Sequence, residues 1–548
     1  MKRGWETALA ASAAGVLSAA VPLSMQTASA AQSSPVTLTM FISPASDIIN
    51  LNTNWFTQYA EKRFHIKLNW IQVPASDALT KQSLLLESGK YPPIFWNGSF
   101  TPIQELQYGQ EGLFIPLNHL IQQYAPNVWK AIQTVPGLKQ GITAPNGDIY
   151  GLPNYNWCWH CDWSAKMWIN QTLLTKYHLA MPTTTGAFQH VLEVFKQHGL
   201  TPLTGATDGW NSNPITFLMN AFIYDDQYDY FYIKNGKLAF APVQPQWKQG
   251  LAYIHGLYAA GLIGKGALTQ NNTILQRQVN NLTTGAFPWG CKECVINNYG
   301  TPQSHFLDWT TVPPLTGPNG VHYAAFYGLP PSGAVFAITN KATPAQEAAI
   351  MKLVNFIWTP LGTEMADFGP EGKYWTYAKK GQDGLMGTQA IFNTDMNEFY
   401  NGNRMQNSGW NQTGPFFQSY AWRNGYVAYP PNTGNGSESM LQLETMKNYT
   451  GHQPRLVYPG FAWVPPADTQ QYSMYQTNIT SYVTQWTDEF IAGGKPLTAA
   501  DWSTYLQGLK NLGLPQYLQM TQQYMGKPFN TGAFRKSASD IKYLEALK

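Results

Sequence analysis

The chain has 548 residues, which is longer than one ordinary domain, so we expect two lobes with ample hydrophobic cores. Charged residues make up only 12% of the sequence, against a usual ~25%, while aromatic residues reach 14%. With 44% hydrophobic residues and a formal charge of +3, we expect a soluble globular protein without a nucleic-acid or anionic-membrane partner.

The N-terminus is typical of a secretion signal spanning residues 1–30. Lys2 and Arg3 precede an Ala-rich apolar segment, and Ala28-Ser29-Ala30 is a small-x-small cleavage signature. The sequence has no lipobox cysteine there, and no later stretch reaches the ~18–20 apolar residues of a membrane span. We expect a secreted, cell-surface-associated protein with no membrane span in the mature chain. Because few carboxylates are available to be protonated in acid, an acidic exterior habitat is a hypothesis.

A strand–helix–strand unit opens the predicted fold. Val36 to Phe41 and Ile66 to Val73 alternate like half-buried strands, and a short helix is predicted between them over Asn54–Arg63. A unit of this length favours parallel pairing with a right-handed crossover. A short strand at Ile94–Phe95 and a helix from Leu117 to Tyr124 are predicted next.

The stretch from Gly147 to Asn170 is predicted to cross between two lobes. It has three tryptophans within seven residues, followed by a strand-like segment from Ala165 to Ile169. Since strand and helix patterns lie both before and after it, we expect its aromatic end to face whatever binds between the lobes.

Alternating elements return after this stretch. The apolar residues Phe188, Val191, Leu192 and Phe195 share one helical face. Later, Gly333 to Thr339 is predicted as a buried strand. The segment from Thr343 to Trp358 is predicted as a helix that begins with a capping box formed by Thr343 and Gln346. The predicted class is α/β, with further helices near Asp468–Ala492 and Ala499–Leu512.

Seven short motifs occur in order along the chain: Leu86–Pro92 (LESGKYP), Gly109–Leu117 (GQEGLFIPL), Tyr124–Asn127 (YAPN), Gly147–Pro153 (GDIYGLP), Trp168–Asn170 (WIN), Met181–Thr185 (MPTTT) and Gly369–Trp375 (GPEGKYW). Together they resemble the extracellular solute-binding proteins of family 1 of carbohydrate ABC importers, especially the large LplA-type lipoprotein-like branch.

That resemblance implies a two-lobe periplasmic-binding-protein-like fold with a hinge and an interlobe ligand cleft. Lobe 1 would hold residues 35–150 plus about 333–400. Lobe 2 would hold 155–325 plus about 401–520, leaving 521–548 as a C-terminal tail. Hinge segments are predicted at Tyr150–Tyr155 and Phe326–Ser332, which both contain Gly-Leu-Pro.

Aromatic rings bind the CH faces of sugars, and amides and carboxylates bind their hydroxyls. In an open α/β sheet, ligands lie outside the carboxyl ends of the strands, which favours Trp96 and Asn97. Any single tryptophan among the 20 is more often a core or surface residue than a ligand contact. The candidate ligand-binding residues are Trp96, Asn97, Asn154, Trp157, Trp159, Asp208, Trp210, Trp289, Glu371 and Trp375.

The pairs Cys158/Cys161 and Cys291/Cys294 could form two disulfides or hold structural zinc or an iron–sulfur cluster. Export favours disulfides, and sequence adjacency favours bonds within each pair. If the two pairs share a metal or are cross-linked to each other, their loops converge and place Trp289 near Trp157 and Trp159. A thioredoxin-like redox role for the first pair is disfavoured, because a strand-like segment follows it rather than a helix.

We expect a binding protein, not an enzyme, that captures a carbohydrate, most simply an oligosaccharide, and delivers it as a monomer to an ABC permease without a cofactor. The alternatives are a secreted glycoside-active enzyme or a binding protein for peptide or another polar solute. A glycosidase would need two acidic groups facing each other, and Asp148, Asp162, Asp208 and Glu371 are available but unpaired in the sequence.

Overall fold

The computed structural model describes residues 34–297, 304–395, 406–431 and 433–547, so the predicted secretion signal lies outside the described residues. Met1–Pro35 and Val36–Lys548 are two separate units, and every element below belongs to the second. Within the described ranges, none of the helices has the length and apolar character needed to cross a membrane.

Five strands form the first sheet, in the order β2-β1-β3-β12-β4. β1 pairs in parallel with β2 and β3, whereas β12 is antiparallel to β3 and β4. The predicted parallel unit and the late buried strand are confirmed. The strands are β1 (Val36–Ile42), β2 (Ile66–Gln72), β3 (Ile94–Phe95), β4 (Gly151–Leu152) and β12 (Phe336–Ile338).

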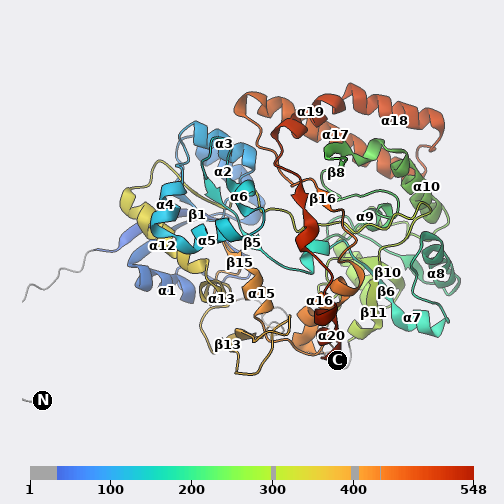
Figure 1. The fold of residues 1–548 in the computed structure, drawn as a ribbon, viewed down its shortest axis with the longest axis horizontal. Coiled ribbons are helices and arrows are strands. Elements are labelled where there is room, and N and C mark those ends of the chain that lie inside the picture. The colour runs from blue at the N-terminus through green and yellow to red at the C-terminus, as the bar shows by residue number, and fades with distance from the viewer. Residues whose placement is uncertain (1–33, 298–303, 396–405, 432, 548) are drawn as a thin grey trace, which may run out of the picture. The chain divides into compact units, whose positions relative to one another are not determined.

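The helices around this sheet begin where their capping residues predict. The Asn54 side chain accepts hydrogen bonds from the N–H groups of Phe56 and Thr57 and starts α1 (Trp55–Phe64). The predicted capping box of Thr343 is present at the start of α12 (Pro344–Ile357), which packs beside β1 although it comes far later in the chain (Figure 1). The others are α2 (Ala78–Glu87), α3 (Pro102–Gln110), α4 (Asn118–Tyr124), α5 (Pro126–Thr134), α6 (Leu138–Ile142) and α13 (Pro360–Phe368).

Four strands form the second sheet, in the order β11-β6-β10-β7. The four apolar residues predicted to share one face of α8 (Thr185–Gln197) are all buried, as expected. The strands are β6 (Met167–Asn170), β7 (Thr201–Leu203), β10 (Thr284–Pro288) and β11 (Trp309–Val312), and the other helices are α7 (Gln171–Lys176), α9 (Pro214–Met219), α10 (Pro245–Ala259) and α11 (Asn272–Asn280).

The C-terminal helices share a hydrophobic core with the second sheet, since buried residues of both belong to one cluster. In Figure 1, the red helix α17 (Pro466–Ala492) packs against the green α10, and α19 (Leu514–Tyr524) packs against α17. The helices predicted near 468–492 and 499–512 are confirmed as α17 and α18 (Ala499–Asn511). The remaining elements are β5 (Tyr155–Asn156), β8 (Phe231–Lys234), β9 (Lys237–Phe240), β13 (Trp375–Tyr377), β14 (Phe392–Thr394), β15 (Phe417–Gln418), α15 (Tyr420–Asn424), α16 (Ser437–Asn448), β16 (Leu456–Val457), β17 (Phe529–Asn530) and α20 (Ala538–Ala546).

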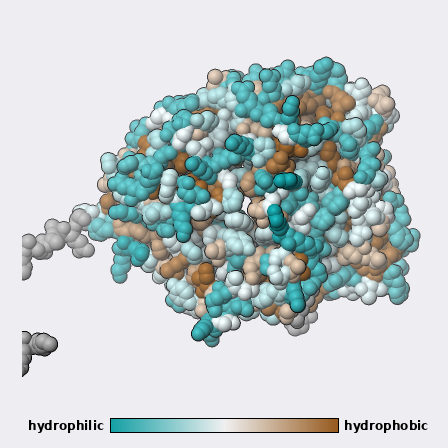
Figure 2. Space-filling model, in the orientation of Figure 1, coloured by the Kyte–Doolittle hydropathy of each residue, from teal (hydrophilic) through white to brown (hydrophobic). Residues whose placement is uncertain are grey.

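The chain crosses between the sheets through residues 153–166, from β4 to β6, and returns through residues 313–335, from β11 to β12. The predicted hinge segment Phe326–Ser332 lies on the second crossing, whereas Tyr150–Tyr155 includes β4 and only the start of the first crossing. A third segment runs beside the first, since β15 pairs in parallel with β5. We propose that residues 410–417 belong to lobe 1, because Trp410 and Phe416 pack in the core of the first sheet. Figure 2 shows hydrophilic residues over much of the face in view, with hydrophobic residues in scattered patches.

Candidate functional site

A groove of ≈ 820 Å³ lies at the carboxyl ends of β1, β2 and β3, and we call it the strand-end groove. This is the place where ligands bind in open α/β sheets. Among the described residues that line it, none is charged. Its polar groups are hydroxyls and carboxamides, including those of Ser43, Ser46, Gln72, Asn97, Gln412 and Thr413.

A strained turn forms one wall of this groove. Asn411 and Gln412 have φ angles of 41° and 56°, a left-handed conformation that is uncommon for residues other than glycine. The Asp367 carboxylate accepts a hydrogen bond from the Gln412 N–H at 2.8 Å, and Asn154 Nδ2 donates to the Gln412 carbonyl at 2.9 Å. Strain held in place by several partners is typical of functional sites. Neither residue is among the candidates from the sequence, where their only local signal is the turn sequence Asn-Gln-Thr-Gly at residues 411–414.

Asn97 lines the strand-end groove, whereas the neighbouring Trp96 does not. Nδ2 of Asn97 donates a hydrogen bond to the Ser43 carbonyl at 2.7 Å. The indole of Trp96 is 0% exposed, and its Nε1 donates to the Thr413 carbonyl at 2.9 Å. The candidate pair is therefore divided between the groove and the core, because successive residues at a strand end point to opposite sides.

A second, smaller cavity of ≈ 160 Å³ lies at the two crossings, and we call it the crossing pocket. It brings together the candidates Asn154 and Trp157 from the first crossing with Tyr327 from the second. Asp162 also lines this pocket and is 7% exposed. From the sequence it was considered only as a possible glycosidase carboxylate. The hydrogen bond from Asn154 to Gln412 connects this pocket to the wall of the strand-end groove.

Phe534 joins the aromatic residues of both crossings. Its ring centroid lies 6.1 Å from that of Trp157, 5.8 Å from that of Trp159 and 4.9 Å from that of Phe326. The candidate Trp159 is half-buried, and its Nε1 donates to Thr450 Oγ1 at 3.1 Å. The C-terminal tail thus packs against both crossings, and Phe326 is the contact that lies in a predicted hinge segment.

Three other candidates lie on loops at the end of the second sheet. Trp210 is 39% exposed and offers an open aromatic surface, whereas Trp289 is 5% exposed and packs in a core cluster. Asp208 accepts a hydrogen bond from the N–H of Asn272 at the start of α11. Of the three, Trp210 is the one with a ring available to a ligand in this conformation.

The last two candidates lie near the β13–β14 hairpin. Trp375 is 3% exposed and donates Nε1 to the Gly369 carbonyl at 3.0 Å. Glu371 is exposed and forms an isolated bridge with Trp375. Neither residue lines the strand-end groove or the crossing pocket.

Both cysteine pairs are disulfides, Cys158–Cys161 and Cys291–Cys294, with Cα–Cα distances of 5.1 and 5.5 Å. These distances lie in the usual range, so the pairing favoured by sequence adjacency is confirmed. With the sulfurs bonded to each other, these cysteines offer no thiolates to zinc or an iron–sulfur cluster.

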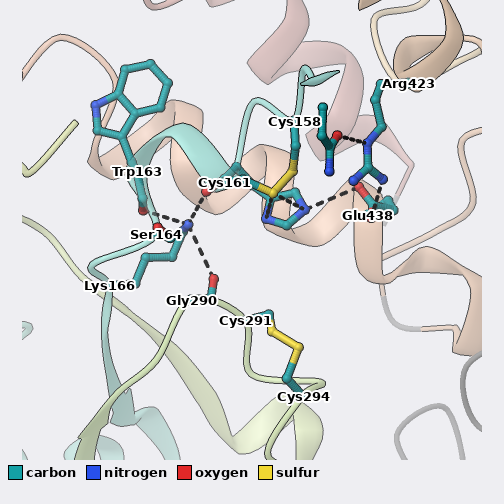
Figure 3. Close-up of a disulfide and its surroundings, with 12 residues drawn as sticks. Cys158, Cys161, Trp163, Ser164, Lys166, Gly290, Cys291, Cys294, Arg423 and Glu438 are labelled. Atoms are coloured by element: carbon teal, nitrogen blue, oxygen red, sulfur yellow. Dashed lines mark hydrogen bonds and ion pairs between the residues drawn. A yellow bond between two sulfur atoms is a disulfide. The ribbon is translucent and has the colours of Figure 1, made fainter. Parts of the chain in front are cut away.

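The two disulfide loops converge through strand pairing rather than through a shared metal or cross-link. β10 is antiparallel to β6, and the Trp289 N–H donates to the Lys166 carbonyl at 3.1 Å. The buried Lys166 Nζ donates to the carbonyls of His160 at 2.6 Å and Gly290 at 3.5 Å, which joins the loops (Figure 3). Burial lowers the pKa of Lys166 to about 7. Trp289 nevertheless packs in a different hydrophobic cluster from Trp159.

A charged network lies beside the first disulfide (Figure 3). Glu438 lies 3.4 Å from both His160 Nε2 and an Arg423 guanidinium nitrogen, and Arg423 Nε donates to Asn156 Oδ1 at 3.1 Å. Burial raises the pKa of Glu438, but His160 and Arg423 outweigh it and hold that pKa at about 2. The network connects the first crossing to α15 and α16.

Replacing both cysteines of the first disulfide, C158S/C161S, is expected to lower the free energy of unfolding by ~2 kcal/mol, because the closed loop is short. Chemical denaturation would measure this. The double variant C291S/C294S, with the same separation, is the matched comparison. A loss above ~4 kcal/mol would contradict a purely local constraint.

Comparisons with known proteins agree with this architecture. A family described as bacterial extracellular solute-binding protein matches residues 50–360. The fructooligosaccharide ABC transporter substrate-binding protein FusA of Streptococcus pneumoniae is 25% identical over 511 residues, covering 86% of this chain and 87% of that protein. The structure of S. pneumoniae FusA in complex with kestose aligns with a TM-score of 0.73 and 21% identity, over 89% of this chain and 98% of that one.

An extracellular solute-binding protein from Bifidobacterium longum subsp. infantis aligns with a TM-score of 0.71 and 17% identity, over 89% of this chain and 97% of that one. These structures share the two-lobe fold. Since the family match covers more than half of the sequence, the chain belongs to the bacterial extracellular solute-binding proteins.

Proposed function

We propose that this protein captures an oligosaccharide between its two lobes and delivers it to an ABC permease. Membership of the solute-binding family supports capture of a solute, and the name of the S. pneumoniae relative supports a sugar importer. Closure of the lobes would follow from ligand contacts on both sides, which shift the equilibrium toward a closed form. We place the protein outside the cell, at the cell surface, as a monomer.

The observation that carries this proposal is the uncharged strand-end groove. Its hydroxyls and carboxamides suit the hydroxyl groups of a neutral sugar. A peptide brings charged termini, and burying an unpaired charge costs far more free energy than burying a hydroxyl that gains a hydrogen bond. Among the described residues lining the groove, no cation or carboxylate would pair with such termini. A neutral carbohydrate is therefore the better fit.

We propose binding without turnover. The four carboxylates that a glycosidase could have used lie in different places. Asp148 accepts a hydrogen bond from Asn146, Asp208 accepts from the start of α11, Glu371 lies beside β13, and Asp162 lines the crossing pocket.

Thermal unfolding against a panel of neutral oligosaccharides tests the function. A sugar at ~100 times its dissociation constant should stabilise the protein by ~2.7 kcal/mol and should be recovered intact. A shift accompanied by sugar breakdown would replace binding with hydrolysis, and stabilisation by peptides alone would replace the ligand class.

Asn97→Ala is expected to weaken binding of the selected sugar about tenfold, because it removes a polar group of the strand-end groove. Titration calorimetry would measure the dissociation constant. Asn319→Ala is the control, since Asn319 is exposed and its Nδ2 donates to Gln249, away from the groove. Equal affinities of the two variants would remove Asn97 from the site.

A further inference from the structure

The crossing pocket brings together three residues that each have a buried polar atom without a described partner. Trp157 Nε1, Asp162 Oδ2 and Tyr327 Oη are each buried, and no described group forms a hydrogen bond with them. All three residues line the pocket. They supply one N–H donor, one carboxyl oxygen and one hydroxyl that can donate or accept.

Leaving a buried polar atom unpaired costs about 1–3 kcal/mol, and most buried polar groups in proteins have a partner. Three such atoms on residues around one cavity indicate that the cavity is built for a guest that supplies the partners. At about 30 Å³ per molecule, the ≈ 160 Å³ cavity has room for roughly five waters, so it can hold a small polar ring.

The other walls are aromatic. Tyr155 and Trp157 come from the first crossing, and Phe529 and Phe534 come from the C-terminal tail. Flat apolar rings beside a few convergent polar atoms match the CH faces and hydroxyls of a sugar. Asp162 and Tyr327 come from different crossings, which the Tyr327 N–H already joins by donating to the Asp162 carbonyl at 2.8 Å. A guest that bonds to both side chains would add a second link between the two crossings.

We infer that the crossing pocket binds one neutral sugar ring of the solute, whose hydroxyls pair with Trp157, Asp162 and Tyr327. This rests on the proposed function and adds a second, more enclosed subsite beside the strand-end groove. Asp162 is the one charged residue among the described pocket lining, so an acidic sugar would meet a carboxyl group and no cation. Burial raises the pKa of that carboxyl well above its usual range, which suits hydrogen bonding to a hydroxyl.

Gly328 leaves room for both Phe326 and the Asp162 carboxyl. A Cβ at Gly328 would lie 2.6 Å from Phe326 Cζ, 2.8 Å from Asp162 Cγ and 3.0 Å from Asp162 Oδ1. A side chain there would push the carboxyl away, so the glycine on the second crossing leaves room for the acid from the first. Gly328→Ala is therefore expected to weaken sugar binding as well.

The test removes one polar atom at a time while keeping an aromatic ring at each position, the same ring in Tyr327→Phe and a smaller one in Trp157→Phe. In Tyr327→Phe and Trp157→Phe, the dissociation constant of the sugar found by the panel is expected to rise about tenfold each. Tyr327→Phe should leave the unfolding midpoint of the ligand-free protein unchanged or higher, because the unpaired hydroxyl is lost. Loss of affinity without loss of stability distinguishes a ligand contact from a structural residue.

Two matched controls carry the same substitutions outside the pocket. Tyr505 and Trp247 also have buried polar atoms without described partners, and neither lines the crossing pocket. Tyr505→Phe and Trp247→Phe should change the dissociation constant less than twofold. If Tyr327→Phe and Trp157→Phe bind as tightly as the wild type while Asn97→Ala does not, the pocket proposal is overturned and the proposed function stands. If the wild type binds no saccharide, both are overturned.

Discussion

Replacing Trp96 by alanine is expected to lower the free energy of unfolding by about 3–5 kcal/mol, the range found when a buried tryptophan or phenylalanine is truncated. Its ring is 0% exposed and packs edge-to-face on Phe336 and Trp410, with centroids 5.8 and 5.4 Å away. The variant also removes the donor to the Thr413 carbonyl, which lies in the wall of the strand-end groove. Chemical denaturation at equilibrium measures the loss.

Trp129→Ala is the matched control, because the same side chain is 39% exposed on α5. A change within about 0.5 kcal/mol is expected there. Trp96→Phe should fall between the two, since it keeps an aromatic ring but loses the hydrogen bond. If Trp96→Ala keeps its stability and loses only sugar affinity, Trp96 contacts the ligand after all.

The second large effect is a fall in stability as the pH rises from about 4 to about 8. The raised pKa values belong to carboxyl groups that are buried or, for Asp229 and Glu293, half-buried, and burial is the largest cause of each shift. The group comprises Asp226, raised to about 6, Asp225, Asp229 and Asp367, raised to about 7, and Glu293 and Glu364, raised to about 8.

The sign follows from proton binding. Between the unfolded pKa of about 4 and the folded pKa of each group, the native state holds more protons than the unfolded state. The stability that each group contributes is therefore fully present below about pH 4 and is lost as the pH rises through its folded pKa. Glu438 acts in the opposite direction in stronger acid, because its pKa is about 2. Burial also lowers the pKa of His160 and of His452, so the stability that they contribute falls as the pH drops below the ordinary histidine pKa of about 6.5. The carboxyl groups are the larger set, so we expect maximum stability near pH 4.

Glu364→Gln isolates one of these groups. The Glu364 carboxyl accepts hydrogen bonds from Thr394 Oγ1 at 2.7 Å and Trp422 Nε1 at 3.0 Å, both neutral donors. An amide of the same shape cannot ionise, so the difference in unfolding free energy between pH 4 and pH 8 should shrink by on the order of 4 kcal/mol. A wild-type optimum near neutral pH would contradict the prediction.

The sequence by itself determined the order and type of the main elements. Alternation in Val36–Phe41, one apolar face in Phe188–Phe195 and the capping box at Thr343 are local patterns, and each formed the predicted element. For the cysteines, the separation of three residues favoured bonds within each pair, but the sequence left a metal site open, and the structure decided for the two disulfides. These features depend on spacing along the chain, which the sequence states directly.

The tertiary structure alone decided which side chains line the cavities. Trp96 and Asn97 are neighbours, yet packing against Trp410, far along the chain, placed one in the core and the other in the groove. Gln412, which precedes β15 on the third segment between the sheets, also lines the groove. Tyr327 and Asp162, from different crossings, line the same crossing pocket. Which distant residues line one cavity depends on how the two sheets and the three crossing segments pack together. No local pattern in a single sequence encodes the distances between such residues.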